Sequence, residues 1–378
     1  MKQILSARYK ALNINLDRSI YGTFAEIGGG QETSSFFFKA GGASGTVAKT
    51  ISAYDKSFSD ANYSRSGKYV SEQRLEKMLE KEYGELQSLL APERGQDTCF
   101  FAFCNTVETI NFKKDNQGHG WLGLRFQTQP GETPCEIVVH VLLHEREPVQ
   151  QQYTLGLLGV NLIYHAFRTS TDEDAFLEGL TENIAPGALE VNMIRMRGPA
   201  FAETDNRLLS VKLVKNGLTP LAIFDRNGNT CQPGDMLYKK NVMILRGSFR
   251  PITYAGFDML KTSHSRMKRE LLCDKNNAVT FCEITLDNML QQGSFDEQDF
   301  LDRVDLLNGM GQNVMISNFR EFYRLTAYLS YIKIQQIRLV VGADVLAKVL
   351  DPAFYEELKG GLLEAMGRLF QKHVKMFV

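Results

Sequence analysis

The chain has 378 residues, of which 43 are Lys or Arg and 44 are Asp or Glu, so its formal net charge at pH 7 is -1. A chain of this length can bury a large core without a disulfide or metal, and it is long enough for two domains. The balanced charge, with no long run of either sign, disfavours a nucleic-acid-binding arm. No signal-peptide core and no apolar stretch of about 18 residues stands in the sequence, so we expect a cytoplasmic protein outside the membrane.

The cysteines and histidines give no sign of a metal site. The cysteines stand singly, without a CxxC pair or a nearby histidine, so we expect reduced thiols packed as small hydrophobic groups. They are Cys99, Cys104, Cys135, Cys231, Cys273 and Cys282. His140 and His144 are four residues apart on an expected strand, a separation of about 13 Å, which is too far to share one metal ion.

Two glycine-rich segments mark the first sixty residues. The first, Gly28 to Gly30, precedes an aromatic run at residues 36–38 that we expect to form a short strand, and the second, residues 41–46, precedes an expected helix. Glycines permit positive φ and close backbone approach, as a phosphate-binding loop requires. The spacing matches neither Walker A nor GxGxxG, and a self-packed loop is the alternative. The candidate donors of this second segment are Gly41, Gly42, Ser44, Gly45, Thr46 and Lys49.

The pattern then indicates an α+β domain over residues 1–188. An amphipathic helix begins near Ser71, and three strand-like runs follow at residues 99–112, 120–127 and 136–145. Polar, glycine-containing turns separate these runs, which favours an antiparallel sheet. The run at residues 152–167 is apolar on almost every side and predicts an internal helix.

From residue 189 to residue 378, continuous apolar strands alternate with helices. This rhythm predicts an α/β domain with a mostly parallel sheet and helices on both faces, either doubly wound or barrel-like. The last run, VKMFV, has the composition of a central strand although nothing follows it. We therefore expect either an edge strand or a chain truncated at its C-terminus.

The candidate site lies where the strands of this second domain end. Residues 241–260 predict a strand, a tight polar turn and a helix, and the turn offers backbone N–H groups and a guanidinium to a phosphate. Parallel α/β folds bind ligands at the carboxyl ends of their strands, so neighbouring loops should converge there. Ordinary helix capping is the alternative for each residue. The predicted phosphate-binding residues are Gly247, Ser248, Arg250, Thr253, Ser317 and Asn318, with Glu283 and Asp225 as catalytic acid/base candidates.

These features predict a protein that binds a phosphorylated small molecule or nucleotide, with the reaction, the cofactor and the oligomeric state left open. The alternative from another class is a scaffold or regulatory binding protein that docks a partner through its N-terminal sheet and glycine loops. A third interpretation is a haloacid dehalogenase-like phosphatase, because Asp225 follows one strand and Ser317 another. Against it, Asn227 replaces the second aspartate, and Asn227-Gly228 is typical of a hairpin turn.

Three long motifs resemble a widespread bacterial family of cytoplasmic proteins whose activity is unassigned. They are YGTFAEIGGGQETSSFFFKAGGASGTVAKTISAYDKSFSDANY, RGSFRPIT and ISNFREFYRLTAYL. Members carry the labels nicotinate-nucleotide adenylyltransferase or TonB-dependent receptor, and they tend to continue beyond the point where this chain stops. The first label implies a nucleotidyltransferase with HxGH-like and ISSTxxR-like motifs, whose nearest matches here are residues 118–120 and 316–318. The second requires a signal peptide and a lipid-facing barrel, and the sequence shows neither.

Overall fold

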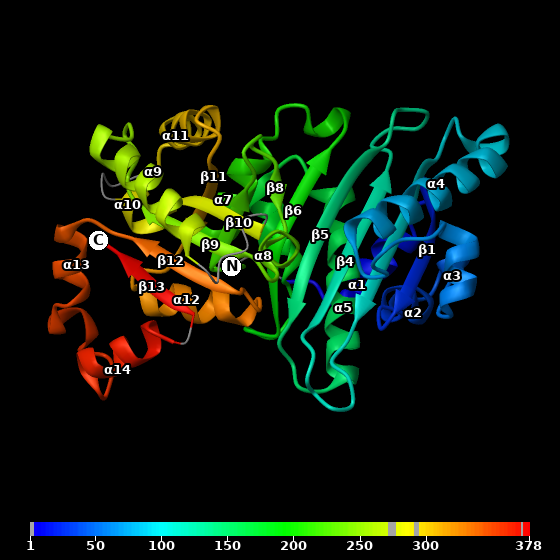
Figure 1. The fold of residues 1–378 in the computed structure, drawn as a ribbon. Helices are drawn as coiled ribbons and strands as arrows, with labels where there is room; N and C mark the ends of the chain where they lie inside the picture. Colours follow the sequence, from blue (N-terminus) through cyan, green and yellow to red (C-terminus); the bar gives the residue numbers. More distant parts are fainter. Residues whose placement is uncertain (1–3, 271–276, 291–294, 372) are drawn as a thin grey trace. The chain divides into compact units, whose positions relative to one another are not determined.

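The structure, a computed structural model, describes residues 4–270, 277–290, 295–371 and 373–378. The chain divides into two compact units, Met1–Asp205 and Asn206–Val378, each built around one sheet (Figure 1). Helices flank both sheets, so the predicted α/β fold class is confirmed. No helix among the described residues is long and apolar enough to cross a membrane.

The first unit holds a six-stranded sheet in the order β2-β1-β3-β4-β5-β6. β1 runs parallel to both β2 and β3, whereas β3, β4, β5 and β6 are successively antiparallel, which confirms the predicted antiparallel strands. The strands are β1 (Ile20–Gly28), β2 (Val47–Ile51), β3 (Cys99–Glu108), β4 (Gly118–Phe126), β5 (Cys135–Leu143) and β6 (Leu189–Arg197).

The sixth strand corrects the boundary expected at residue 189. β6 pairs with β5 in the first sheet, and the division between the compact units falls after Asp205. An apolar run predicts a strand but carries no information about the sheet that the strand joins.

The helices of the first unit pack on both faces of this sheet. Phe24 of β1 lies against Phe37 of α2 and Phe101 of β3, with ring centroids 5.0 and 5.6 Å apart. The next residue, Ala25, points to the opposite face and joins a core that includes Leu75 of α4, as the alternation of side chains along a strand requires. The helices are α1 (Ala7–Asn15), α2 (Glu32–Ala40), α3 (Lys56–Tyr63), α4 (Glu72–Arg94), α5 (Pro148–Arg168) and α6 (Glu173–Leu180), with 3-10 turns η1 (Ala43–Gly45) and η2 (Pro199–Phe201).

The glycine-rich region differs from the prediction in both of its elements. Residues 36–38 belong to helix α2 rather than to a strand, and the segment at 41–46 leads into strand β2 rather than into a helix. The helix begins where the Glu26 carboxylate accepts the backbone N–H groups of Thr33 and Ser34, at 2.9 and 3.1 Å. Since this cap comes from seven residues upstream, a local aromatic pattern cannot reveal it.

The second unit holds a seven-stranded open sheet in the order β13-β12-β9-β10-β11-β7-β8. The strands from β13 to β11 are parallel, and the β7–β8 hairpin adds on antiparallel to β11. The sheet is therefore doubly wound rather than a barrel, the hairpin at Asn227-Gly228 is confirmed, and VKMFV forms an edge strand. The strands are β7 (Leu221–Phe224), β8 (Thr230–Cys231), β9 (Asn241–Arg246), β10 (Ala278–Thr285), β11 (Asn313–Ser317), β12 (Gln336–Val340) and β13 (Val374–Phe377).

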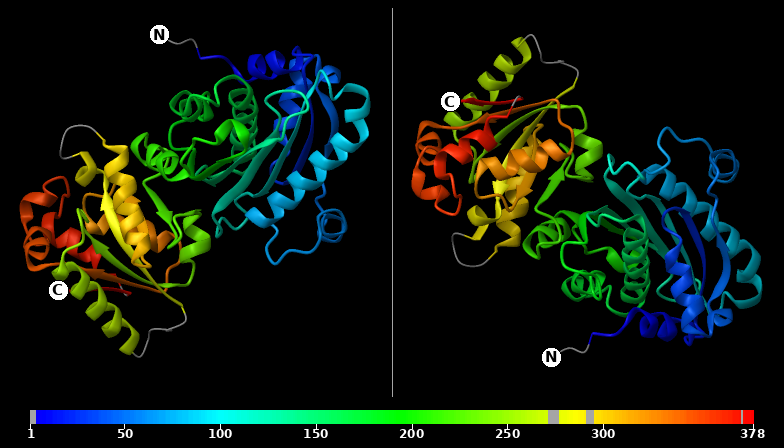
Figure 2. Two further views of the ribbon diagram at one scale, coloured as in Figure 1. Left: turned by 90° about the horizontal axis from the view of Figure 1, so that it is seen from above. Right: turned by 90° about the horizontal axis from the view of Figure 1, so that it is seen from below.

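Two helix layers cover this second sheet (Figure 2). Alternate residues of β9 divide between them: Met243 and Leu245 pack against the layer of α7, α9, α10 and α11, and Val242 and Ile244 against the layer of α8, α12, α13 and α14. The helices are α7 (Asn206–Lys215), α8 (Pro233–Leu237), α9 (Tyr254–Arg269), α10 (Leu286–Leu290), α11 (Glu297–Gly309), α12 (Phe322–Tyr331), α13 (Ala343–Val349) and α14 (Gly361–Leu369), with the 3-10 turn η4 (Pro352–Tyr355).

The described cysteines Cys99, Cys104, Cys135, Cys231 and Cys282 are free thiols. Burial raises the pKa of the Cys282 thiol to about 12, so this side chain is a neutral core group at physiological pH. Cys273 lies outside the described residues.

Candidate functional site

The carboxyl edge of the second sheet brings together Arg246, Glu283 and Ser317, from the ends of neighbouring strands β9, β10 and β11. Arg246 donates through Nε and Nη2 to the two Glu283 oxygens, at 2.9 Å each, and Ser317 Oγ donates to Oε1 at 2.6 Å. Glu283 and Ser317 are fully buried. A bidentate guanidinium satisfies the carboxylate, so this geometry describes a buried ion pair rather than an acid/base group open to a substrate.

The loop after β9 lies at the same edge, as predicted, and its own neighbours hold it in place. Gly247 N–H donates to the Glu283 carbonyl at 3.0 Å, and the Ser248 carbonyl accepts from Arg303 of α11 at 3.1 Å. β9 and β12 are neighbours, and the helices that follow them pack on opposite faces, so the loop stands at a topological switch point of the sheet.

The polar side chains of this loop already have partners. Arg250 donates to Asp299 at 2.6 Å and shares that carboxylate with Arg303, and the Thr253 hydroxyl accepts the Gly256 N–H at 3.1 Å as the N-cap of α9. Asn318 is exposed beyond β11, and its backbone N–H donates to the Pro220 carbonyl at 2.9 Å. These contacts are those of ordinary helix capping and loop packing, the alternative expected for each residue of the loop.

Asp225 does not join this edge. Because β7 is antiparallel to β11, its last residues lie at the amino edge of the parallel strands. There the Asp225 carboxylate accepts from the backbone N–H groups of Asn227 and Asn229, at 2.8 and 2.9 Å, and holds the hairpin turn. The expected convergence of Asp225 with Glu283 is therefore wrong, and the phosphatase interpretation loses its pairing of Asp225 with Ser317.

The second glycine-rich segment belongs to the other unit and packs on itself. Gly41 and Gly42 have φ of 93° and 72°, Gly45 N–H donates to the Gly42 carbonyl at 3.0 Å, and Thr46 is buried. Burial lowers the pKa of Lys49, but hydrogen bonds to Glu82 and Glu85 outweigh it and raise that pKa. Ser44 is exposed. This arrangement matches the alternative of a self-packed loop.

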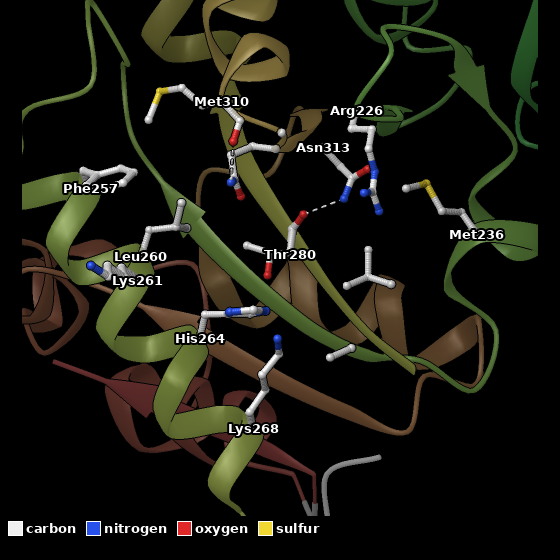
Figure 3. Close-up of a pocket in the computed structure, with 14 residues that line it drawn as sticks. Arg226, Met236, Phe257, Leu260, Lys261, His264, Lys268, Thr280, Met310 and Asn313 are labelled. Carbon is white, nitrogen blue, oxygen red and sulfur yellow. Dashed lines mark hydrogen bonds between the residues drawn. The ribbon is translucent and has the colours of Figure 1, made fainter. Parts of the chain in front are cut away.

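A pocket of about 630 Å³ lies at the amino edge of the second sheet, and we name it the amino-edge pocket (Figure 3). Its floor is the start of β10, Ala278 to Thr280, and the start of β11 at Asn313. β10 is an inner strand between β9 and β11, yet its first residues are only partly buried. The helix layers thus leave the beginning of a central strand uncovered, and this gap forms the pocket.

In the described part of the chain, the ionisable side chains that line the amino-edge pocket are basic. Lys261, His264 and Lys268 come from one face of α9, and Arg226 comes from the β7–β8 turn. No Asp or Glu lines the pocket among the described residues, and within that part of the chain none of the four basic side chains donates a hydrogen bond or forms an ion pair. Arg226, Lys261 and Lys268, unpaired within the described residues, create a positive potential around the hollow that attracts an anion.

Uncharged groups complete the walls. Apolar side chains cover part of the surface: Met236, Phe257, Leu260 and Met310. At the floor, Asn313 Nδ2 donates to the Thr280 carbonyl at 2.9 Å, which fixes the amide beside the strand (Figure 3). The pocket thus offers cations at its walls and hydrogen-bonding groups at its floor, within the size range of small-molecule sites.

His264 is the group of the pocket that titrates nearest neutrality. Burial lowers its pKa, and the neighbouring Lys268 ammonium lowers it further. At pH 7 the imidazole is therefore mostly neutral, and a bound anion would favour its protonated form.

Sequence reasoning missed all four basic residues because it examined the carboxyl ends of the strands. A signal was present in Lys261, His264 and Lys268, which recur at intervals of three and four residues and so share one helix face. Arg226 gave no such signal, because only the pairing of β7 with β11 brings its turn to the pocket.

A second hollow of about 610 Å³ lies on α12 and α14, lined in part by Tyr323, Arg324 and Arg368. Its arginines have acidic partners: Arg324 pairs with Glu321 and Glu357, and Arg368 with Glu364. Its charge is therefore more nearly balanced than that of the amino-edge pocket. No group of three His, Cys, Asp or Glu side chains in the described parts of the chain could hold a metal ion.

The fold defines a two-unit α/β protein, and basic side chains line a hollow of its second unit. No protein-family model matches the chain, and no curated protein matches it. Among solved structures it is similar to the competence/damage-inducible protein CihA from Agrobacterium tumefaciens, at 14% identity and a TM-score of 0.30, over 43% of this chain and 97% of that one.

Two further structures give the same kind of match. The CinA superfamily protein KP700603 from Klebsiella pneumoniae has 10% identity and a TM-score of 0.32, over 43% of this chain and 98% of that one. The CinA superfamily protein from Enterobacter cloacae has 11% identity and a TM-score of 0.31, over 44% and 98%. TM-scores of this size do not establish a shared activity, so function has to be inferred from the side chains. Neither the adenylyltransferase label nor the receptor label occurs among these three.

Proposed function

We propose that the second unit binds a phosphorylated small molecule, such as a sugar phosphate or a nucleotide, in the amino-edge pocket. One observation carries the proposal: Arg226, Lys261, His264 and Lys268 surround one hollow without an acidic residue in its described lining. Cations gathered without counter-charges repel one another, and anionic groups placed beside them relieve that repulsion while accepting charge-assisted hydrogen bonds.

The size and the walls of the pocket support a phosphorylated organic molecule over a bare ion. A volume of about 630 Å³ lies in the range that holds ligands of metabolite size. Phe257 and Leu260 offer an apolar surface to the carbon skeleton, and Thr280 and Asn313 offer hydrogen bonds.

The loop from Gly247 to Thr253 is the rival location for the same ligand. Its place at the switch point between β9 and β12 supports it, whereas the pairing of Arg250 with Asp299 weighs against it. The rival function, docking of a partner on the first sheet, has less support, since β3, β4 and β5 are almost wholly buried and Phe112 is the exposed large apolar side chain of residues 99–145.

Calorimetric titration of the full chain with glucose 6-phosphate and with AMP tests the proposal. We expect the double variant Lys261→Gln/Lys268→Gln to weaken binding at least tenfold, because it removes two charge-assisted contacts of about 1.5 to 3 kcal/mol each. Arg250→Ala is the matched control, and it should bind as the unmodified protein does. Loss of binding in Arg250→Ala alone would move the site to the Gly247 loop, and equal binding by all three proteins would refute both locations.

A further inference from the structure

We infer that the ligand of the amino-edge pocket carries two anionic groups, one at each side of the hollow, joined by an uncharged hydroxyl-bearing middle. This inference rests on the proposed function and narrows it to a class of ligand: a short sugar or polyol with phosphates at two positions.

The placement of the cations leads to this class. Lys261, His264 and Lys268 project from α9, whereas Arg226 projects from the β7–β8 turn beyond the start of β10 (Figure 3). In the close-up, Thr280 lies between Lys261 and Arg226. The basic groups therefore form two separate sets on two elements rather than one cluster around a single point.

The chemistry of the two sets also differs. Three side chains of α9 supply point charges and an imidazole, which can surround a phosphate from several directions. Arg226 supplies a planar guanidinium that can bind a second phosphate through two parallel hydrogen bonds. No described residue pairs with Arg226, so within the described part of the chain its donors are open to a ligand.

Among the described residues, no charged side chain lies in the region between the two sets. It contains Thr280 and Asn313, and Asn313 donates one N–H to the Thr280 carbonyl (Figure 3). A hydroxyl and an amide oxygen suit a ligand segment that bears alcohol groups, whereas a continuous polyanion would meet an acceptor there. The pattern of cation, polar neutral floor and cation therefore favours a bisphosphorylated polyol.

A pair of probes that differ by one phosphate tests the inference. Fructose 6-phosphate and fructose 1,6-bisphosphate are titrated into the full chain at one ionic strength, and we expect the bisphosphate to bind at least tenfold more tightly. Arg226→Gln should reduce the affinity for the bisphosphate to that for the monophosphate and change the latter less than twofold. Lys268→Gln should weaken both probes. Lys348→Gln, at an exposed lysine of α13, controls for a general loss of charge.

The outcomes separate the two proposals. If both probes bind equally, or if Arg226→Gln weakens both by the same factor, the two-anion inference is wrong while the proposed function stands. If neither probe binds the unmodified protein, both fail. Arg226 is exposed, so its replacement should leave the urea midpoint unchanged, and a shifted midpoint would overturn its assignment as a ligand-binding residue.

Discussion

At the scale of single residues, charge pairing separates the structural cations of the second unit from those open to a ligand. Arg246 is mostly buried and satisfies both oxygens of Glu283, and Arg250 pairs with Asp299, which Arg303 also contacts. Arg226 and Lys268 have no such partner in the described part of the chain. From the sequence alone, all of these are basic residues in expected turns or helices. Only the fold shows which of them are paired with an acidic neighbour.

Arg246→Met should destabilise the second unit by about 3 to 5 kcal/mol. The substitution leaves the fully buried Glu283 carboxylate without its counter-charge, and an unpaired buried charge is costly. Urea unfolding followed by fluorescence measures the change. Arg250→Ala, which breaks a partly exposed pair, should cost less than about 1 kcal/mol. Similar losses in the two variants would show that Glu283 does not depend on Arg246.

Anion binding should strengthen as the pH falls from 7.5 to 5.5, and His264 should account for the change. Burial and Lys268 lower the pKa of His264, so the imidazole gains its charge only as the pH drops below its ordinary value. We expect the affinity of the unmodified protein relative to His264→Gln to rise about fivefold over this range, equivalent to about 1 kcal/mol. Because the phosphate titrates equally with both proteins, the ratio of their two affinities reports His264 alone. A ratio that does not change with pH would exclude His264 from the site.

The same shift fixes the sign of the pH dependence of stability without ligand. Because the pKa of His264 is lower in the folded chain than in the unfolded chain, the unfolded chain binds more protons as the pH falls below the unfolded value. The contribution of a neutral His264 to the free energy of unfolding is therefore fully present above the unfolded-state pKa. It is lost as the pH falls through the folded-state pKa. An anion should offset this loss.

At the scale of elements, the glycine-rich region of the first unit serves packing. Gly28 has a φ of 75°, and a Cβ there would lie 2.0 Å from the Val107 carbonyl oxygen of the neighbouring strand. The N-terminus of α2, where a phosphate would be expected, is already occupied by the Glu26 carboxylate. The glycines correctly indicated backbone with positive φ. They could not show whether the nearby helix N-terminus binds a ligand or a carboxylate of the same chain.

Gly28→Ala should therefore be far more damaging than Gly131→Ala. Both glycines have a φ of 75°, but a Cβ at Gly131 meets no atom within 4 Å. Gly131→Ala should cost only the backbone strain of a positive φ, about 1 to 2 kcal/mol. Gly28→Ala adds to this strain a clash with the backbone of the neighbouring strand, which cannot move freely. Thermal unfolding of the two variants compares them directly. Equal midpoints would mean that β1 and β3 can separate at this point.

At the scale of the whole molecule, the sequence predicted the fold class better than it predicted the site. Apolar periodicity identified β9, β10, β11 and β12 because each strand is buried on both faces, and hydrophobic runs report burial directly. It could not predict that β6 joins the first sheet or that β7 runs antiparallel, since pairing partners are not encoded locally. The inverted direction of β7 moved Asp225 away from Glu283 and brought Arg226 to the pocket.

The division after Asp205 predicts that the second unit carries the site alone. All residues that line the amino-edge pocket lie in Asn206–Val378, and each unit has its own core. A chain of residues 206–378 should unfold cooperatively and bind glucose 6-phosphate within about threefold of the full chain. A chain of residues 1–205 should not bind it. Binding by the chain of residues 1–205 would place the anion site in the first unit and contradict this prediction.

A crystal structure of the full chain soaked in tungstate would show the site most directly, because anomalous scattering locates this phosphate-like anion without ambiguity. We predict a strong peak in the amino-edge pocket, beside Lys261, His264 and Lys268, that disappears in Lys261→Gln/Lys268→Gln. A peak at the loop from Gly247 to Thr253 instead, or an empty pocket at a concentration that fills other sites, would contradict the account.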